Sequence, residues 1–315
     1  MTTKLNVILA GTYYSKHARR GGPSQVFSLL VDEYVKRMKH IAKALNVNII
    51  NTRFPIELYV VAGDRIVKHV GLKAIFLTIP VIARSRVVCT CGISIMNLIV
   101  SLLAKLLMKK LCYYLHGMEL LEYKYEEKSL MKSLVYIAIE LLMLKVTSAI
   151  IYVSKFYEKL TRSVYKHIKA RSFVIHNGLD HEDLECVPKI SEGTLRLPEK
   201  YMLYVGRPTR CKGFHITLHL FSIIIKLFPD LYLIAVVPSK KKAQNLIAKY
   251  VEDTKVRNKI ILINMVHKEV LRILYRNAVC TLIPSLFESF NMVALESLAC
   301  NTPVLITKNC GVLEV

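Results

Sequence analysis

The feature that most constrains this chain is a repeated alternation of short apolar runs with helical stretches. Runs such as Leu5–Ala10 and Tyr201–Val205 are apolar at nearly every position, which is typical of strands in a parallel sheet covered on both faces. The polar segment His181–Lys200 interrupts the alternation, which then restarts. The pattern therefore predicts an α/β chain with two successive Rossmann-like domains. We expect them at residues 1–182 and 201–315, with a linker at 183–200.

The expected elements place the loops that follow the strands at one edge of each sheet. Ligands of such sheets bind at the carboxyl ends of the strands, so these loops are the candidates for chemistry. In the first domain we expect strands at Leu5–Ala10, Val47–Thr52, Leu58–Ala62, Ile75–Ile79, Arg86–Thr90, Leu111–His116, Ala149–Ser154 and Ser172–His176. In the second we expect strands at Tyr201–Val205, Leu231–Val237, Lys259–Ile263, Val279–Ile283 and Pro303–Ile306.

The charge of the chain limits its partners. Lys plus Arg number 45 against 23 for Asp plus Glu, so the net charge is +22. Such a surface attracts nucleic acid, an anionic membrane or small phosphorylated ligands. No helix-turn-helix, zinc-finger or RNA-binding signature is visible, so specific nucleic-acid binding is not expected.

Two long apolar stretches, Ile93–Met108 and Ser133–Val153, are interrupted by charged residues and do not predict clean spanning helices. Beside so much positive charge, they suit peripheral contact with a bilayer. The eight cysteines form no C-x-x-C pair, and most lie in apolar surroundings. We therefore expect them to be reduced and the protein to be cytoplasmic.

Two glycine loops open helices at equivalent places in the two domains. Gly21-Gly22-Pro23 follows the first strand of the chain, and Gly206–Gly213 follows the first strand of the second domain. Free N–H groups at a helix N-terminus attract phosphate, and glycine permits close approach. Arg207 and Lys212 in the second loop would face a diphosphate. A plain strand-to-helix turn and a solvated basic loop remain the alternatives.

A third loop carries two glutamates. The segment Pro284–Pro303 follows a strand, with Glu288 in the loop and Glu296 inside the helix that starts near Met292. A carboxylate beside a helix start can accept hydrogen bonds from sugar hydroxyls, and the helix end favours phosphate. The alternative is one loop acid and one acid on the helix surface.

Five motifs in order resemble those of family 4 (group 1) retaining glycosyltransferases. They are the Gly21-Gly22 loop, Leu115-His116-Gly117, His176-Asn177-Gly178-Leu179-Asp180, Gly206-Arg207 with Lys212-Gly213, and the E-x(7)-E pair Glu288 and Glu296. The E-x(7)-E context is the most specific of the five, and together they run from about residue 11 to the end of the chain. The resemblance implies the GT-B fold, in which two Rossmann-like parallel-sheet domains face an inter-domain cleft.

The resemblance also implies a role for each matching residue. Arg207 and Lys212 would bind the donor diphosphate, Glu296 would hold the ribose hydroxyls, and Glu288 would contact the transferred sugar. The donor would be a UDP- or GDP-sugar and the acceptor lipid-linked or a glycan. The sequence contains no D-x-D, which agrees with an enzyme that needs no metal or cofactor.

Backbone groups and a histidine complete the implied site. Phe290, Asn291 and Met292 would offer backbone N–H groups to the donor, and Gly22 would let the first domain approach the phosphates. His116 would orient a sugar hydroxyl or the acceptor; without the resemblance it reads as a packed or capping histidine. The implied location is the cytoplasm, with peripheral attachment to the inner face of the cell membrane.

Three departures from the family pattern bear on this expectation. Asn291 and Asn301 stand where glycine is usual, and Asn is among the residues most tolerant of positive φ. The sequence ends at Gly311–Val315, where family members usually continue, so a truncated donor domain is expected. This leaves as alternatives a degenerate transferase that binds a membrane or a partner protein, and a basic nucleic-acid-binding protein.

Overall fold

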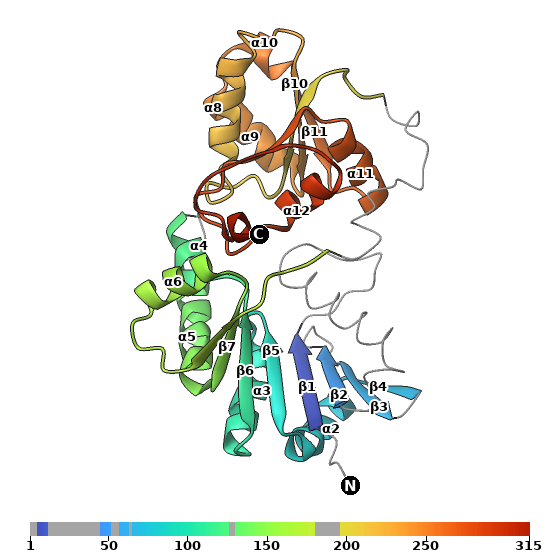
Figure 1. Cartoon of the computed structure of the whole chain (residues 1–315), viewed down its shortest axis with the longest axis vertical. Helices are drawn as coiled ribbons and strands as arrows, with labels where there is room; N and C mark the ends of the chain where they lie inside the picture. Colours follow the sequence, from blue (N-terminus) through green and yellow to red (C-terminus); the bar gives the residue numbers. More distant parts are fainter. Residues whose placement is uncertain (1–4, 12–44, 52–56, 63–64, 126–129, 180–195) are drawn as a thin grey trace. The chain divides into compact units, whose positions relative to one another are not determined.

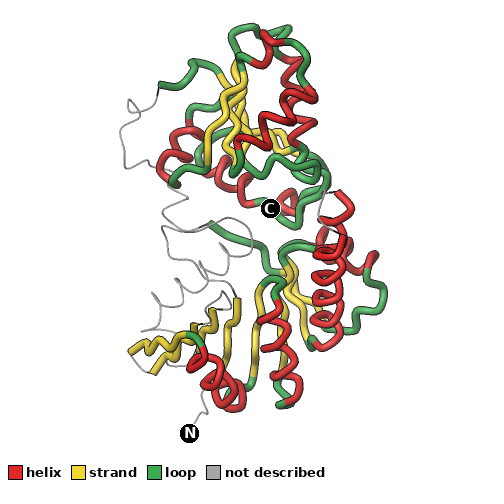
Figure 2. The backbone as a smooth tube through the Cα atoms, turned by 180° about the vertical axis from the view of Figure 1, so that it is seen from behind, coloured by secondary structure: helices red, strands yellow, loops and turns green. Residues whose placement is uncertain are grey.

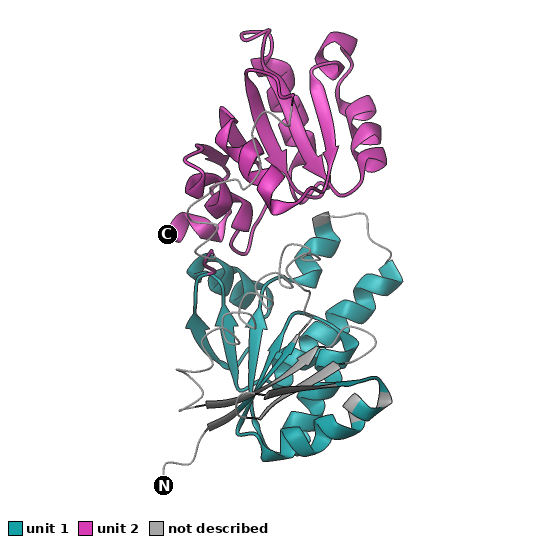
Figure 3. Ribbon diagram, turned by 90° about the vertical axis from the view of Figure 1, so that its right-hand side faces the viewer, with its two compact units in different colours: residues 1–176 teal, residues 177–315 magenta. Residues whose placement is uncertain are grey.

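The chain forms two compact units, Met1–His176 and Asn177–Val315, each built around one sheet (Figure 3). The loop with Gly22 and most of the expected linker 183–200 lie outside the described residues. The computed structural model describes residues 5–11, 45–51, 57–62, 65–125, 130–179 and 196–315.

The sheet of the first unit has the strand order β4-β3-β2-β1-β5-β6-β7-β8 (Figure 1). Its pairings are parallel, except that β3 runs antiparallel to both β2 and β4. The strands are β1 (Leu5–Gly11), β2 (Leu45–Asn51), β3 (Glu57–Ala62), β4 (Arg65–Val70), β5 (Val87–Cys91), β6 (Lys110–Leu115), β7 (Ala149–Tyr152) and β8 (Arg171–Val174).

The helices α3 and α5 of the first unit lie on the same face of this sheet (Figure 2). Serine caps fix two helix starts, because Ser94 accepts from the N–H of Asn97 and Ser154 accepts from that of Tyr157. Val100 and Ala104 pack against Ile8 and Val88 of the sheet. The helices are α2 (Leu72–Arg84), α3 (Ile95–Leu106), α4 (Glu119–Tyr125), α5 (Leu130–Val146) and α6 (Lys155–Val164).

One expected strand is wrong. Ile75–Ile79 lies inside helix α2, and the strand that precedes it is Arg65–Val70, which the sequence analysis missed. A short apolar run fits a buried strand and a helix equally well, and Pro80 within the helix weakened the helical pattern further.

The second unit contains an all-parallel sheet with the order β11-β10-β9-β12-β13. The order reverses between β9 and β12, so the loops after these two strands meet at a switch point. The strands are β9 (Tyr201–Val205), β10 (Tyr232–Val237), β11 (Ile260–Asn264), β12 (Cys280–Ile283) and β13 (Val304–Ile306). The helices are α8 (Phe214–Ile224), α9 (Lys240–Tyr250), α10 (Thr254–Arg257), α11 (Lys268–Arg276), α12 (Met292–Ala299) and the 3-10 helix η3 (Gly311–Glu314).

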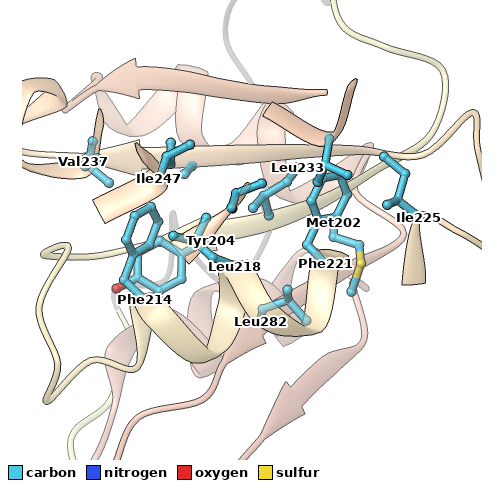
Figure 4. Close-up of a cluster of buried hydrophobic side chains, with 14 of the residues drawn as sticks. Met202, Tyr204, Phe214, Leu218, Phe221, Ile225, Leu233, Val237, Ile247 and Leu282 are labelled. Carbon is cyan, nitrogen blue, oxygen red and sulfur yellow. The ribbon is translucent and has the colours of Figure 1, made fainter. Parts of the chain in front are cut away.

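Both faces of this second sheet are buried, which explains the continuous apolar runs. On one face Met202 and Tyr204 pack with Phe214 and Phe221 of α8 (Figure 4). On the other, alternate residues of the same strand, Tyr201 and Leu203, belong to a separate cluster with side chains of α11. A sheet covered on both sides is the arrangement that the sequence predicted.

Two further expectations concern the apolar stretches and the cysteines. Of the helices that the structure describes, none has the length and apolarity needed to cross a lipid bilayer. Cys300 is disulfide-bonded, so the expectation of a reduced thiol is wrong at that residue. The free cysteines among the described residues are Cys89, Cys91, Cys112, Cys211, Cys280 and Cys310.

Candidate functional site

The loops after β9 and β12 lie against each other at the switch point. The N–H of Leu286 donates to the carbonyl oxygen of Cys211 over 2.8 Å. Gly213 has a φ of +67°, and a Cβ atom built there would lie 1.9 Å from the carbonyl oxygen of Pro284. Only glycine permits both this backbone conformation and this approach. The glycine expected to admit phosphate therefore also joins the two loops.

An ion pair joins the same loops through side chains. Lys212 Nζ lies 2.7 Å from Glu288 Oε1 and 2.8 Å from Oε2. Ser285, directly after β12, donates from Oγ to Glu288 Oε1 over 2.8 Å. Glu288 is buried, whereas 28% of the Lys212 side chain remains exposed. From the sequence, Lys212 and Glu288 were each expected to contact the donor, but their contact with each other was not expected.

The electrostatics keep Lys212 charged. Burial alone would lower the pKa of the Lys212 ammonium, but the neighbouring Glu288 carboxylate outweighs burial and raises it above its ordinary value. The nearby Arg207 guanidinium acts in the opposite direction. Two of the three ammonium protons point to Glu288, which leaves one donor for a ligand. The loop can therefore present two cations to an anion.

Hydrogen bonds to the backbone of the loop after β9 hold Arg207 in place. Gly206 donates its N–H to the carbonyl oxygen of Val236 over 3.0 Å, and the Tyr204 hydroxyl donates to the carbonyl oxygen of Arg207 over 2.7 Å. The N–H of Thr209 donates to the same carbonyl over 2.8 Å. The Arg207 side chain is exposed at the carboxyl end of β9, where a ligand can reach it.

A third loop, between β13 and η3, holds the backbone of Glu288 on both sides. The N–H of Glu288 donates to the carbonyl oxygen of Asn309 over 2.9 Å, and its own carbonyl accepts from Gly311 over 3.1 Å. Val312 donates in the same way to Phe290 over 2.9 Å. Gly311 and Val312 therefore support the candidate site directly.

The start of α12 depends on an asparagine in an unusual backbone conformation. Asn291 has a φ of +104°, and its Oδ1 accepts from the N–H of Ala294 over 2.9 Å. Asn301 ends the helix with a φ of +57°. The prediction that asparagine would supply positive φ at both places is confirmed. Phe290 is buried and Met292 is the first helical residue, so both lie where backbone N–H groups converge on the helix start.

Glu296, one turn further along α12, is held by a buried tyrosine. The Tyr275 hydroxyl donates to Glu296 Oε2 over 3.0 Å, and the Tyr275 carbonyl accepts from Thr302 Oγ1 over 2.6 Å. Burial, with help from the Glu296 carboxylate, raises the pKa of Tyr275 well above its usual range, so Tyr275 remains a donor. One carboxylate oxygen of Glu296 is thereby fixed in place.

His116 lies in the first unit, directly after β6. Its ring is buried and packs on Tyr114 with the ring centroids 4.2 Å apart. Burial lowers the pKa of His116 to about 3, so the imidazole is neutral at physiological pH. Among the described residues, nothing hydrogen-bonds to its Nε2. The neutral ring leaves one nitrogen able to accept a hydrogen bond, and Nε2 is buried in this structure.

A buried carboxyl supports the loop that contains His116. Glu140 in α5 accepts through Oε2 from the N–H of Glu119, over 3.1 Å, and from the Tyr165 hydroxyl, over 2.7 Å. Its Oε1 is buried without a partner in the described structure. Burial raises the pKa of Glu140 to about 7, although both hydrogen bonds oppose the rise. This group was not anticipated from the sequence.

The structure thus brings together most of the expected donor residues. Arg207, Lys212, Glu288, Phe290, Asn291, Met292 and Glu296 lie on adjacent loops and one helix of the second unit. Gly22 lies outside the described residues. The sequence analysis missed Ser285 and Tyr275; Ser285 could have been found from its position at a strand end, three residues before Glu288.

The described residues bear on the expectation that no metal is needed. They contain no group of three or more His, Cys, Asp or Glu side chains that could hold a metal ion. That the protein needs no metal stays a prediction for experiment.

Comparison with known proteins finds a protein family that the second unit resembles. Residues 189–315 match the model of the family described as Glycosyl transferases group 1. An uncharacterized glycosyltransferase of Methanocaldococcus jannaschii is 27% identical over 195 residues, which cover 56% of this chain and 47% of that protein. A D-inositol 3-phosphate glycosyltransferase of Corynebacterium urealyticum is 28% identical over 164 residues, covering 47% of this chain and 37% of that protein. The matches thus span less than half the length of these curated relatives.

Solved structures match almost the whole chain in fold. The sucrose-phosphate synthase of Thermosynechococcus elongatus has a TM-score of 0.66 at 17% identity, covering 98% of this chain and 82% of that one. The Anabaena protein HepE, solved with UDP and glucose, has a TM-score of 0.61 at 15% identity, with 98% and 82% covered. The predicted α/β architecture of GT-B type is confirmed, and residues 189–315 are similar to the glycosyltransferase group 1 family.

Proposed function

We propose that this protein is a glycosyltransferase that moves a sugar from a UDP- or GDP-sugar to a lipid-linked or glycan acceptor, with retention of configuration. The observation that carries the proposal is the Lys212–Glu288 pair beside Arg207, at the carboxyl ends of β9 and β12. This pair lies in the segment that matches the glycosyltransferase group 1 family. A cation pair at a sheet switch point, next to a helix start, suits a nucleoside diphosphate.

The chemistry is dominated by the charge of the leaving group. As the bond between the anomeric carbon and the diphosphate breaks, negative charge develops on the phosphate oxygens. Arg207, the remaining donor of Lys212 and the N–H groups at the start of α12 would stabilise that charge. Glu296, with one oxygen held by Tyr275, would accept hydrogen bonds from the ribose hydroxyls.

The sugar would be handled by two residues. Glu288 would accept from a hydroxyl of the transferred sugar while remaining paired with Lys212. His116 would orient a sugar hydroxyl or the acceptor, and its neutral ring supports this role. Retention would follow from attack by the acceptor on the face that the diphosphate leaves. No metal or cofactor takes part in the proposed reaction, and the protein would act at the cytoplasmic face of the membrane.

Isothermal titration with a panel of UDP- and GDP-sugars tests the proposal. At least one donor should bind saturably, and Lys212→Ala and Glu296→Ala should each weaken it. Lys255→Ala and Glu252→Ala remove exposed residues of the same types outside the site, and they should bind as the wild type does. Absence of binding across the panel would refute the proposal.

Turnover separates the proposal from its alternatives. Release of nucleoside diphosphate in the presence of acceptor, unchanged by EDTA, supports a metal-independent transferase. Binding without turnover would identify a degenerate transferase. Salt-dependent affinity for DNA or RNA that survives Glu288→Ala would instead favour a nucleic-acid-binding protein.

A further inference from the structure

Helix α3 exposes a stripe of large apolar side chains on its outer face. Ile95, Ile99, Leu102 and Leu106 follow one another at intervals of four, three and four residues, which places them on one side of the helix. Each is between 41% and 78% exposed. The opposite side, with Val100 and Ala104, packs on the sheet. The helix is therefore apolar where a surface helix is normally polar.

Helix α5 carries a second stripe. It consists of two pairs of residues that lie two turns apart on one side of the helix, namely Leu134 with Val135 and Leu141 with Leu142. Each of the four side chains is between 45% and 51% exposed. The two helices contact each other. Helix α3 connects β5 to β6, and α5 lies in the connection from β6 to β7. Because these three strands are parallel neighbours, right-handed crossovers place both helices on the same face of the sheet (Figure 2). The two stripes thus lie on neighbouring helices, and together we call them the α3–α5 face.

The exposed charges on α3 and α5 themselves are all basic, although α4, which packs on α5, carries Glu119 and Glu122. From Arg65 to Met118 the sequence contains no Asp or Glu, but it contains eight Lys or Arg. The one acidic residue of α5, Glu140, is fully buried. Lys105 and Lys145 are exposed among the apolar side chains. Large contiguous apolar patches are rare on soluble monomers and mark interaction sites.

The charge pattern distinguishes between two occupants of this surface. In a symmetric dimer the same face meets itself, so Lys105 and Lys145 would be buried in the interface, and neither α3 nor α5 offers an exposed acid to pair with them. Anionic lipid headgroups would neutralise these lysines, while the leucines and isoleucines enter the interfacial region of the bilayer. Lipid therefore satisfies both the apolar and the basic part of the face.

We propose that the α3–α5 face of the first unit binds the surface of an anionic lipid bilayer. Helices α3 and α5 would lie parallel to the membrane plane, with their apolar stripes inserted and Lys105 and Lys145 at headgroup level. The inference deepens the proposed function by naming the membrane-binding surface, and it rests on that function only for the idea that the acceptor is lipid-linked. Membrane binding itself needs neither donor nor catalysis.

Vesicle flotation of the full chain tests the proposal. The wild type should float with phosphatidylcholine vesicles that contain about 30 mol% phosphatidylglycerol, bind pure phosphatidylcholine at least about tenfold more weakly, and lose affinity in high salt. Leu102→Gln/Leu106→Gln should reduce binding at least about tenfold. Lys105→Glu/Lys145→Glu should do the same at low salt.

A matched control lies on the other unit. Ile223→Gln/Leu227→Gln removes two exposed apolar side chains with the same spacing of four residues, and it should float as the wild type does. Equal flotation of the α3 variant and this control would overturn the proposal, as would a wild type that binds neither kind of vesicle. A dimer that the α3 variant disrupts, without any vesicle binding, would also overturn it. Titration of the same variants with nucleotide sugars keeps this outcome separate from the proposed function, since neither pair lies in the donor site.

Discussion

Removal of one partner of the Lys212–Glu288 pair should destabilise the second unit strongly and asymmetrically. Lys212→Met leaves the Glu288 carboxylate, which is 7% exposed, with Ser285 as its remaining side-chain donor in the described structure. Breaking a buried ion pair in this way costs about 3–5 kcal/mol. Glu288→Gln instead leaves an ammonium with 28% of its side chain exposed, which water can reach, and the amide oxygen can still accept from it. The expected loss is about 1–2 kcal/mol.

The double variant Lys212→Met/Glu288→Gln contains neither charge. Its loss should be smaller than the sum of the single losses by about 2 kcal/mol, because the main cost of Lys212→Met is the unpaired carboxylate. The free energy of unfolding is measured by urea titration with far-UV circular dichroism, on ligand-free protein and at one pH. Lys255→Met, at an exposed lysine, should stay within about 0.5 kcal/mol of the wild type. Additive losses, or a loss under about 1 kcal/mol for Lys212→Met, would refute the reasoning.

Three further predictions concern the backbone and a buried acid. Gly213→Ala should cost at least about 2 kcal/mol and weaken donor binding, because the residue has positive φ and its Cβ would meet the Pro284 carbonyl. Wild-type stability would contradict this. Asn291→Gly should cost a few tenths of a kcal/mol, since only the cap to the Ala294 N–H is lost, whereas Asn291→Ala should cost about 2–3 kcal/mol because strain is added. Equal losses would argue against the positive φ. Glu140 has a pKa of about 7 in the folded protein, above its unfolded value of about 4.5. The folded protein is therefore stabilised by the protonated carboxyl at acid pH. The free energy of unfolding should fall as pH rises from about 4.5 to 7, by up to about 3 kcal/mol. Urea titrations at several pH values should show Glu140→Gln gaining on the wild type across that window, and parallel curves would exclude the effect.

The parts of the fold that the sequence predicted are those in which local pattern and burial agree. Strands such as Tyr201–Val205 are buried on both faces, so their composition identifies them without knowledge of their neighbours. Ile75–Ile79 failed because the same apolar composition suits a helix packed on one side. Arg65–Val70 was missed because three of its six residues are basic, although it pairs as an ordinary antiparallel strand.

The candidate site shows the same division between local and distant information. The loop positions of Lys212 and Glu288 follow from strand ends, but their mutual ion pair joins residues 76 apart in the chain. The contact between Tyr275 and Glu296 depends on how α11 and α12 pack, which no spacing in the sequence specifies. Sequence therefore predicts which loops carry the site, and the structure adds which side chains constrain one another.

These constraints imply that the phosphate contacts and the sugar contacts proposed for this site cannot be separated. Three connections join the loop after β9 to the loop after β12. They are the close approach of Gly213 to Pro284, the backbone hydrogen bond from Leu286 to Cys211 and the Lys212–Glu288 ion pair. Because Glu288 is already bound to Lys212, a diphosphate that draws on Lys212 also changes the carboxylate proposed to hold the sugar. A substitution at either residue should then alter KM for the donor and kcat together, rather than one of them alone. If the donor binds as proposed, a site coupled in this way would hold it in one orientation, which is the property that electrostatic stabilisation of the leaving group requires.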